Sequence, residues 1–405
     1  MTEVPVLDAR AAADPRAGRR AGLGAVAPDA WDRLVGPGRG PFRHAFLAAC
    51  EPVALDGFAL EPLVVRAPDG PGDGAGPGDG EAPVAAHAPA YLYDLDLGLF
   101  ARGLGARLIS LLRRLRPRAL RRRVLEVGCP VALGDPFSVA RGADEAAAVG
   151  ALVDLAGDAA RRGAADLVVV RDLEPDGGAA AKALASRGFE AVPLPPSFVL
   201  DLDGGFDSFE GYLAALRSDY RRRARLRLER AAGLAVERLA GPGFGPIAGE
   251  LARLWRCVYE RADEYRREVL PEAFFRGIAR LPAAGVLVLR RPDRSIAAFA
   301  LLLDDRPWLR FLYSGCEAEA ARREGAYFRL LYEIVRTGIE GGYRRVELGI
   351  TTAEPKLDLG ARPVPLEAWI RHRSPFSQAL IGRALRSVLA PRPVAPRRAF
   401  RTEGP

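Results

Sequence analysis

The feature that most constrains this fold is the order of apolar runs between residues 285 and 350. Three strand-length runs follow one another with short connections, at 285–290, 295–304 and 308–314. An amphipathic helix is then predicted over 326–340 and a fourth strand over 345–350. Short connections favour antiparallel neighbours, whereas the helix can return the chain to lie beside the third strand. This order predicts a mixed, mostly antiparallel sheet with helices on its faces.

The first half of the chain repeats this order. "AARRGAADLVVV" (159–170) and "GIEGGYRRVELGI" (338–350) are each a helix end, a glycine and a strand. An α/β (α+β) fold of two similar modules follows, joined near 203–210. We expect residues 1–40 to be disordered and residues 41–205 to form the first module, with a mobile Pro/Gly/Asp loop at 67–83. Residues 206–372 should form the second module, and residues 373–405 a basic tail.

The predicted elements can be given for both halves. In the first half they are strands at 60–66, 83–90, 123–129, 166–170 and 198–202, and helices at 144–162 and 178–187. In the second half they are helices at 207–231, 246–264 and 271–280 and strands at 234–239 and 364–370, besides those of 285–350.

Positive charge is concentrated in three segments. Residues 101–123 carry a net +9, residues 217–230 a net +5 and residues 371–405 a net +7, although the whole chain carries only +8. The remainder is therefore acidic. Basic segments favour phosphate-rich partners such as nucleotide cofactors, RNA or anionic lipid, although solvated helix faces in an arginine-biased chain are equally consistent.

Cysteine and histidine usage predicts neither a metal site nor disulfides. The four cysteines and three histidines are scattered and form no CxxC pair. The N-terminus has no apolar core typical of a secretory signal, and no apolar run is long enough to span a bilayer. We therefore expect a reduced, cytoplasmic protein without a resident metal.

The order of elements resembles that of the GNAT acyltransferases. The resemblance covers about 41–372, and 308–371 is similar to the acyl-CoA-binding half of that superfamily. The whole chain resembles its tandem members, the FemAB-like transferases and the cellulose-related acetyltransferase-type proteins. The stretches that carry it are "SDYRRRARLRLERAAGL" (218–234), "YSGCEAEAARREGAYFRLLYEIV" (313–335) and "VELGITTAEPKLDLGARPVPLEAWI" (346–370).

The resemblance implies a donor phosphate site where the helix at 326–340 begins. Backbone N–H groups at a helix N-terminus, exposed beside a glycine, can bind phosphate. The family signature maps onto Arg322, Gly325 and Tyr327, with Arg323 and Ala326 alongside. Tyr327 departs from the small residue that the family has there. A plain helix-start turn is the alternative.

Three residues are candidates for the chemistry that the resemblance implies. Glu347, on a strand, is a candidate general base for the attacking amine. Tyr313 lies where strands of this superfamily separate, and its hydroxyl could protonate the leaving thiolate. Glu317 is a second candidate base. Each is equally consistent with an ordinary strand or surface position.

Three further residues are candidates for substrate binding. Arg221 follows "S-x-Y" as in the FemAB-like pattern and could bind a phosphate or carboxylate. Lys356 and Gly360 match a Lys and Gly of the family, and the chain has only two lysines.

Three functions remain open at this point. The first is an N-acyltransferase that uses acyl-CoA (acetyl-CoA), with an amine of a small-molecule, cell-envelope or natural-product acceptor. The second is a FemAB-like aminoacyl transferase that uses charged tRNA, favoured by Tyr327 and the basic segments and testable by salt-dependent tRNA binding. The third is a binding module that kept the fold without catalysis.

The two modules are predicted to differ in donor binding. The first places Pro130, Asp135, Pro136, Asp144 and Glu145 between its strand and helix. Prolines lack an N–H, and acids occupy the positive end of a helix dipole. Only the second module is therefore expected to bind a phosphate-bearing donor, with the first as scaffold and one wall of the acceptor cleft.

Overall fold

The computed structural model describes residues 22–67, 82–96, 121–203, 205–262, 268–374, 378 and 397–401. Most of the basic segment 101–123, the loop 67–83 and the tail 373–405 therefore lie outside the described residues. Among the described helices, none is long and apolar enough to cross a membrane.

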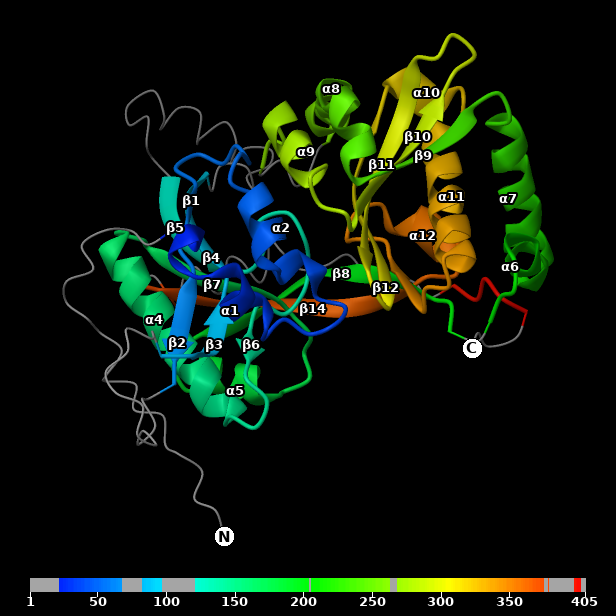
Figure 1. Cartoon of the computed structure of the whole chain (residues 1–405). Coiled ribbons are helices and arrows are strands. Elements are labelled where there is room, and N and C mark those ends of the chain that lie inside the picture. Colours follow the sequence, from blue (N-terminus) through cyan, green and yellow to red (C-terminus); the bar gives the residue numbers. More distant parts are fainter. Residues whose placement is uncertain are drawn as a thin grey trace, which may run out of the picture.

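One 11-stranded sheet runs through the whole molecule (Figure 1). From one edge to the other it consists of β1 (Ala59–Leu60), β4 (Ala90–Asp96), β5 (Arg121–Val127), β7 (Leu167–Leu173), β14 (Arg362–His372), β8 (Glu190–Asp201), β13 (Arg345–Glu347), β12 (Trp308–Cys316), β11 (Ile296–Asp305), β10 (Ala284–Arg290) and β9 (Ala235–Ala240). A smaller sheet contains β2 (Leu63–Arg66), β3 (Val84–Ala88) and β6 (Ser138–Val139). The predicted α/β class is confirmed.

Helices flank the sheet in each half. In chain order they are α1 (Pro28–Asp32), α2 (His44–Ala49), α4 (Glu145–Arg162), α5 (Ala179–Ala185), α6 (Phe209–Ala215), α7 (Ser218–Arg230), α8 (Ala248–Arg261), α9 (Glu272–Ile278), α10 (Ala318–Arg322), α11 (Ala326–Glu340) and α12 (Ala353–Asp358). Short 3₁₀ helices are η1 (Leu23–Ala25), η2 (Gly40–Phe42) and η4 (Gly241–Ile247). In the second half, α11 shares one core with α6 and α7, and α8 and α9 share another with the N-terminal residues.

The repeat inferred from the sequence appears as two parallel strand pairs. In the first half β5 and β7 are parallel and α4 connects them; in the second, β12 and β13 are parallel and α11 connects them. Parallel neighbours require such a crossover, so each half contains one strand–helix–strand unit of the same kind.

The two modules are not separate in space. β14, the last strand of the second module, pairs with both β7 and β8 of the first, and β8 also pairs with β13. Strands of each module therefore pair directly with strands of the other. A division of the chain near 203–210 does not predict this shared sheet.

The expectation of a disordered segment over 1–40 is wrong for residues 22–40. Trp31 is fully buried, and its indole Nε1 donates a hydrogen bond of 2.8 Å to the Phe42 carbonyl. The Gly38 amide donates to the Arg306 carbonyl at 2.9 Å. One tryptophan and a few apolar residues anchor a stretch whose composition is otherwise poor in apolar residues; residues 1–21 lie outside the described part.

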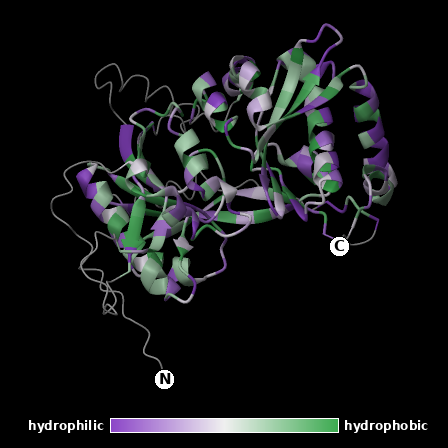
Figure 2. Cartoon of the chain, viewed as in Figure 1, coloured by the Kyte–Doolittle hydropathy of each residue, from purple (hydrophilic) through white to green (hydrophobic). Residues whose placement is uncertain are grey.

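The single helix predicted over 207–231 is two helices. α6 ends at Ala215 and α7 begins at Ser218, and between them Leu216 pairs with Phe400 as an isolated β-bridge. The Arg217 amide donates to the Ala399 carbonyl at 2.8 Å. Contacts with a segment nearly 200 residues away in sequence therefore break a helix that local propensity favours. Figure 2 shows α7 as a strongly hydrophilic helix at the edge of the molecule.

Candidate active site

The candidate active site lies where β12 and β13 separate. The two strands pair only from Trp308 to Arg310 and from Arg345 to Glu347. A bulge on β12 opposite Leu301 and Leu302 then bends that strand, and the chain after β13 turns away at Gly349, whose φ is +71°. The separation predicted from the resemblance is thus present, and α11 begins close to the end of β12.

The N-terminus of α11 is open to an anion. Gly325 is its N-cap residue with a left-handed φ of +68°, no described side chain caps the helix, and its first turn contains no acid. The amides of a first helical turn have no intrahelical acceptor, and the dipole places positive charge there. This is the arrangement that binds phosphate at helix N-termini.

Three arginines lie near this helix end. The position of one of them, Arg230, could not be predicted from the sequence. Arg322 and Arg323 are exposed, and Arg323 forms an ion pair of 2.8 Å with Glu319. Arg230, from the end of α7, donates to the carbonyls of Arg322 and Arg323. A Cβ at Gly325 would lie 3.5 Å from the Arg230 Cδ atom. Arg230 therefore adds a third guanidinium, and only the packing of α7 on this loop brings it there.

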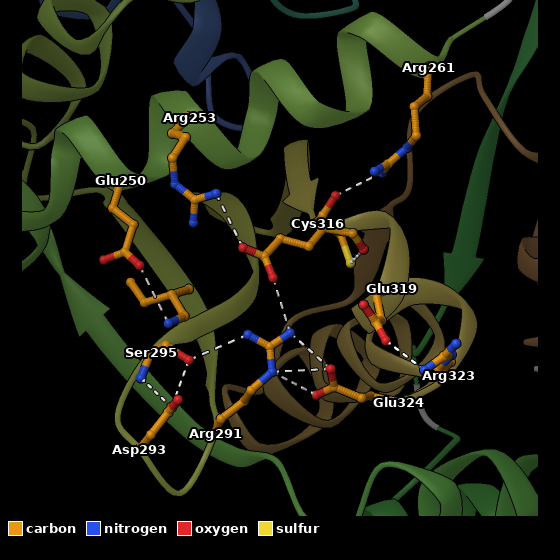
Figure 3. Close-up of polar contacts among 12 residues, drawn as sticks. Glu250, Arg253, Arg261, Arg291, Asp293, Ser295, Cys316, Glu319, Arg323 and Glu324 are labelled. Carbon is orange, nitrogen blue, oxygen red and sulfur yellow. Dashed lines mark hydrogen bonds and ion pairs between the residues drawn. The ribbon is translucent and has the colours of Figure 1, made fainter.

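Acidic side chains near this end are neutralised by arginines (Figure 3). Arg291 forms ion pairs with Glu324 at 2.8 Å and with Glu317 at 3.1 Å, and Glu324, followed by Glu317, raises the pKa of its guanidinium. Arg253 also bonds Glu317 at 3.2 Å. Glu317 thus already has two arginine partners within the protein, which an amine would have to displace.

The corresponding helix in the first module is closed to an anion. Asp144 is the N-cap of α4 and accepts a hydrogen bond of 3.1 Å from the Ala147 amide, and Glu145 lies in the first turn. A carboxylate already occupies the positive end of this helix. The contrast between α4 and α11 supports the assignment of donor binding to the second module.

Tyr327, in the first turn of α11, packs against the protein core. It is nearly buried against the core under α11, and burial raises the pKa of its hydroxyl, which shares a hydrogen bond with Thr352. The side chain that replaces a small residue of the family therefore contacts the loop after β13. Ala326 is fully buried beneath it.

Glu347 is held in a buried ion-pair network. It pairs with Arg310, which also bonds Asp305 at 2.5 Å, and it accepts a hydrogen bond of 3.2 Å from the Ser197 hydroxyl. These contacts tie β8, β11, β12 and β13 together. A carboxylate with these partners is a structural anchor, and the arrangement argues against Glu347 as the base.

The three candidate substrate-binding residues have partners within the protein. Arg221 donates to the Ala214 and Leu216 carbonyls, where it stabilises the end of α6. Lys356 is 1% exposed and its Nζ donates to the Gly349 carbonyl at 3.0 Å; burial lowers its pKa to about 7, although Glu347 opposes this. Gly360, at φ +88°, allows the Phe400 ring to pack on the backbone. Only Lys356 lies beside the point where the strands separate.

Tyr313, on β12 beyond the point where the strands separate, packs against the core beside α8 and contacts an unpredicted carboxylate. Its hydroxyl donates a hydrogen bond of 2.7 Å to Glu268, in the connection between α8 and α9. Both side chains are partly exposed. A phenol bonded to a carboxylate is a suitable acid–base pair. Glu268 belongs to no motif, so no sequence signal could have found it.

Comparison of the sequence and the structure with known proteins shows which families and folds this chain resembles. Residues 214–357 match the family described as "Acetyltransferase (GNAT) domain". The structure of FemX aligns with 88% of this chain and 98% of its own, with a TM-score of 0.55 at 15% identity, which shows a common fold. A tandem GNAT protein from the clavulanic acid biosynthesis pathway aligns at a TM-score of 0.46 and 16% identity. Residues 214–357 are therefore similar to a GNAT acetyltransferase domain, and the chain as a whole shares the fold of FemX.

The likeness to FemX extends over most of the length of both chains. A curated relative is the "Putative 8-amino-7-oxononanoate synthase 2" of Mycobacterium tuberculosis, 27% identical over 307 residues. That match covers 73% of this chain but only 39% of the relative, so the chain spans about two fifths of its length. Within the described residues, no group of three or more His, Cys, Asp or Glu side chains could hold a metal ion.

Proposed function

We propose that this protein transfers an acyl group from acyl-CoA to an amine at the point where β12 and β13 separate. The observation that carries the proposal is the uncapped, left-handed start of α11 beside Arg230, Arg322 and Arg323. A pyrophosphate would accept hydrogen bonds from the first-turn amides and from these guanidiniums. The acyl thioester would then extend toward the separated strands.

The reaction requires one proton to leave the amine and one to reach the departing sulfur. The amine nitrogen attacks the thioester carbonyl, the C–N bond forms, and collapse of the tetrahedral intermediate breaks the C–S bond. Glu268 would accept the proton of the amine, and the Tyr313 hydroxyl would protonate the thiolate. Proton transfer from Glu268 to the Tyr313 oxygen restores both groups.

Donor binding is tested with the full chain and radiolabelled acetyl-CoA. We expect retention by the wild type and its loss in Arg322→Ala combined with Gly325→Val, because both the guanidinium and the access to the amides are removed. Reversing the charges of Asp144 and Glu145 on α4 is the matched control and should leave retention unchanged. Wild-type protein that retains no acetyl-CoA would refute the acyl-CoA proposal.

A second candidate donor is aminoacyl-tRNA, and one observation favours it. The segments 217–230 and 397–401, far apart in sequence, lie side by side at α7, where Arg217 and Ala399 are hydrogen-bonded at 2.8 Å. Both segments contribute exposed arginines, such as Arg222, Arg225 and Arg401, to this part of the molecule. Binding of charged tRNA that weakens steeply with rising salt would support this donor; a flat response would exclude it.

The acceptor is proposed as an amine of a small molecule or of a cell-envelope or natural-product precursor. The cleft wall provided by the first module is where we expect it to bind. A panel of amines, assayed by release of free CoA thiol in the presence of acetyl-CoA, would identify its class.

A further inference from the structure

A cavity of about 480 Å³ lies between β9 and α11, away from the separated strands. It is lined by Val236, Arg238, Arg329, Glu333 and Arg336. The last three recur along one side of α11, and the first two come from the outermost strand of the sheet. β10 and β11 separate this cavity from β12, so it does not belong to the donor site.

The lining is positively charged around one buried carboxylate. The Glu333 side chain is 3% exposed, and its oxygens lie 3.0 Å from Arg329 Nε, 3.5 Å from Arg336 Nε and 3.8 Å from Arg238 Nη2. Three guanidiniums thus face one carboxylate. Glu340 accepts a bond of 2.7 Å from Arg238 at the exposed rim and offsets part of the remaining charge. The lining retains net positive charge.

Two buried polar atoms of this lining have no hydrogen-bond partner among the described residues. They are Arg329 Nε and Glu333 Oε1, which are close to one another but poorly aligned. A buried donor and a buried acceptor left unsatisfied each cost free energy, and a ligand that satisfies both recovers it. The 3.0 Å ion pair between them is therefore not a complete hydrogen bond, and an anion that draws the Arg329 guanidinium toward the cavity gives it a second acceptor.

We propose that this cavity binds the phosphate group of a small metabolite as a second site, beyond the proposed acyl transfer. Phosphate oxygens match the forked donors of Arg238, Arg329 and Arg336. A phosphate that keeps one proton also offers an O–H to Glu333 Oε1. Sulfate has the same shape but is fully ionised near pH 7, whereas phosphate keeps one or two protons, so Glu333 should select phosphate over sulfate.

The test is calorimetric titration of the full chain with inorganic phosphate and with sulfate at constant ionic strength and pH 6.5. We expect saturable phosphate binding, at least tenfold tighter than sulfate binding. Arg238→Gln combined with Arg336→Gln should abolish it. Glu333→Gln, which presents an amide donor, should remove the preference by strengthening sulfate binding, an outcome that loss of folding would not produce.

Two control variants separate this site from other basic surfaces. Arg222→Gln with Arg225→Gln removes the same charge from α7 and should bind phosphate as the wild type does. Arg230→Gln with Arg322→Gln removes it from the proposed donor site, and any phosphate bound there is lost in this variant while the binding that distinguishes phosphate from sulfate remains. Equal affinity for phosphate and sulfate in the wild type, or phosphate binding that survives the Arg238 and Arg336 changes when Arg230 and Arg322 are also replaced, would overturn the proposal. Because acetyl-CoA retention is measured separately, this result stands or fails independently of the donor assignment.

Discussion

Replacing Lys356 by methionine should stabilise the protein near neutral pH. The ammonium is buried, with one hydrogen bond to the Gly349 carbonyl, and burial lowers its pKa from 10.5 to about 7. Each pKa unit corresponds to about 1.4 kcal/mol, so at pH 7 the wild-type fold is about 5 kcal/mol less stable than it would be with the amine neutral in both states. Methionine has a similar volume and carries no charge.

The lost hydrogen bond reduces this gain. Leaving a buried carbonyl without its donor costs about 1–3 kcal/mol, so the Lys356→Met variant should be more stable than the wild type by about 2–4 kcal/mol at pH 7. The sign of the pH dependence is fixed by the lowered pKa. Between pH 7 and 10.5 the unfolded lysine is protonated and the folded one is neutral, so wild-type stability rises with pH and the difference should shrink by about 1.4 kcal/mol per pH unit.

The measurement is urea unfolding followed by pulse proteolysis at pH 6, 7, 8 and 9, because a chain of two modules need not unfold in one step. Comparing variant and wild type at each pH cancels the titration of other groups. Lys182→Met changes the only other lysine, which is exposed on α5, and serves as the control with no pH-dependent difference. A Lys356→Met variant that is less stable at pH 7, or a difference that does not change with pH, would refute the reasoning.

Three other predictions follow from the same structure. Arg230→Gln should weaken acetyl-CoA binding about 10- to 100-fold in calorimetry, since it removes one charge-assisted contact; an unchanged affinity would exclude this arginine from the donor site. Tyr313→Phe should lower kcat at least about 100-fold with little change in KM, and Glu268→Gln should flatten the acidic limb of the kcat–pH profile. Unchanged kinetics in both variants would show that this pair takes no part in the proton transfers. Trp31→Ala should destabilise the protein by about 3–5 kcal/mol in urea unfolding, because it deletes a fully buried ring; a change below about 1 kcal/mol would mean that residues 22–40 contribute little to the fold.

Much of the fold could be predicted from local sequence. Periodicity located α4, α11, β10, β11 and β12 to within two residues, because an amphipathic helix or a buried strand must repeat its apolar residues with its own period. The repeated order of elements predicted two modules of one kind. The glycine at the start of α11, and the acids at the start of α4, were visible for the same reason: capping is a local property of a few adjacent residues.

The contacts of the candidate site residues could not be predicted from the sequence. Gly325 and Tyr313 lie where the resemblance implied, but Glu347 and Lys356 are buried with partners of their own. The sequence around an isolated charged residue in a strand does not indicate whether that residue contacts solvent, substrate or an arginine. Arg310 lies 37 residues before Glu347 in the chain, and only strand pairing brings the two together.

The sequence by itself determined the elements, their order and the asymmetry of the two helix starts, since each depends on residues within a few positions of one another. Only the tertiary structure decided that β8 of the first module pairs with β14 of the second, and that C-terminal residues separate α6 from α7. It also decided which side chains contact one another around the separated strands. It brought Arg230 to Gly325 and Glu268 to Tyr313 from distant segments. The physical reason is that local conformation is set by neighbours in the chain, whereas a site is set by contacts that form only when separate elements pack.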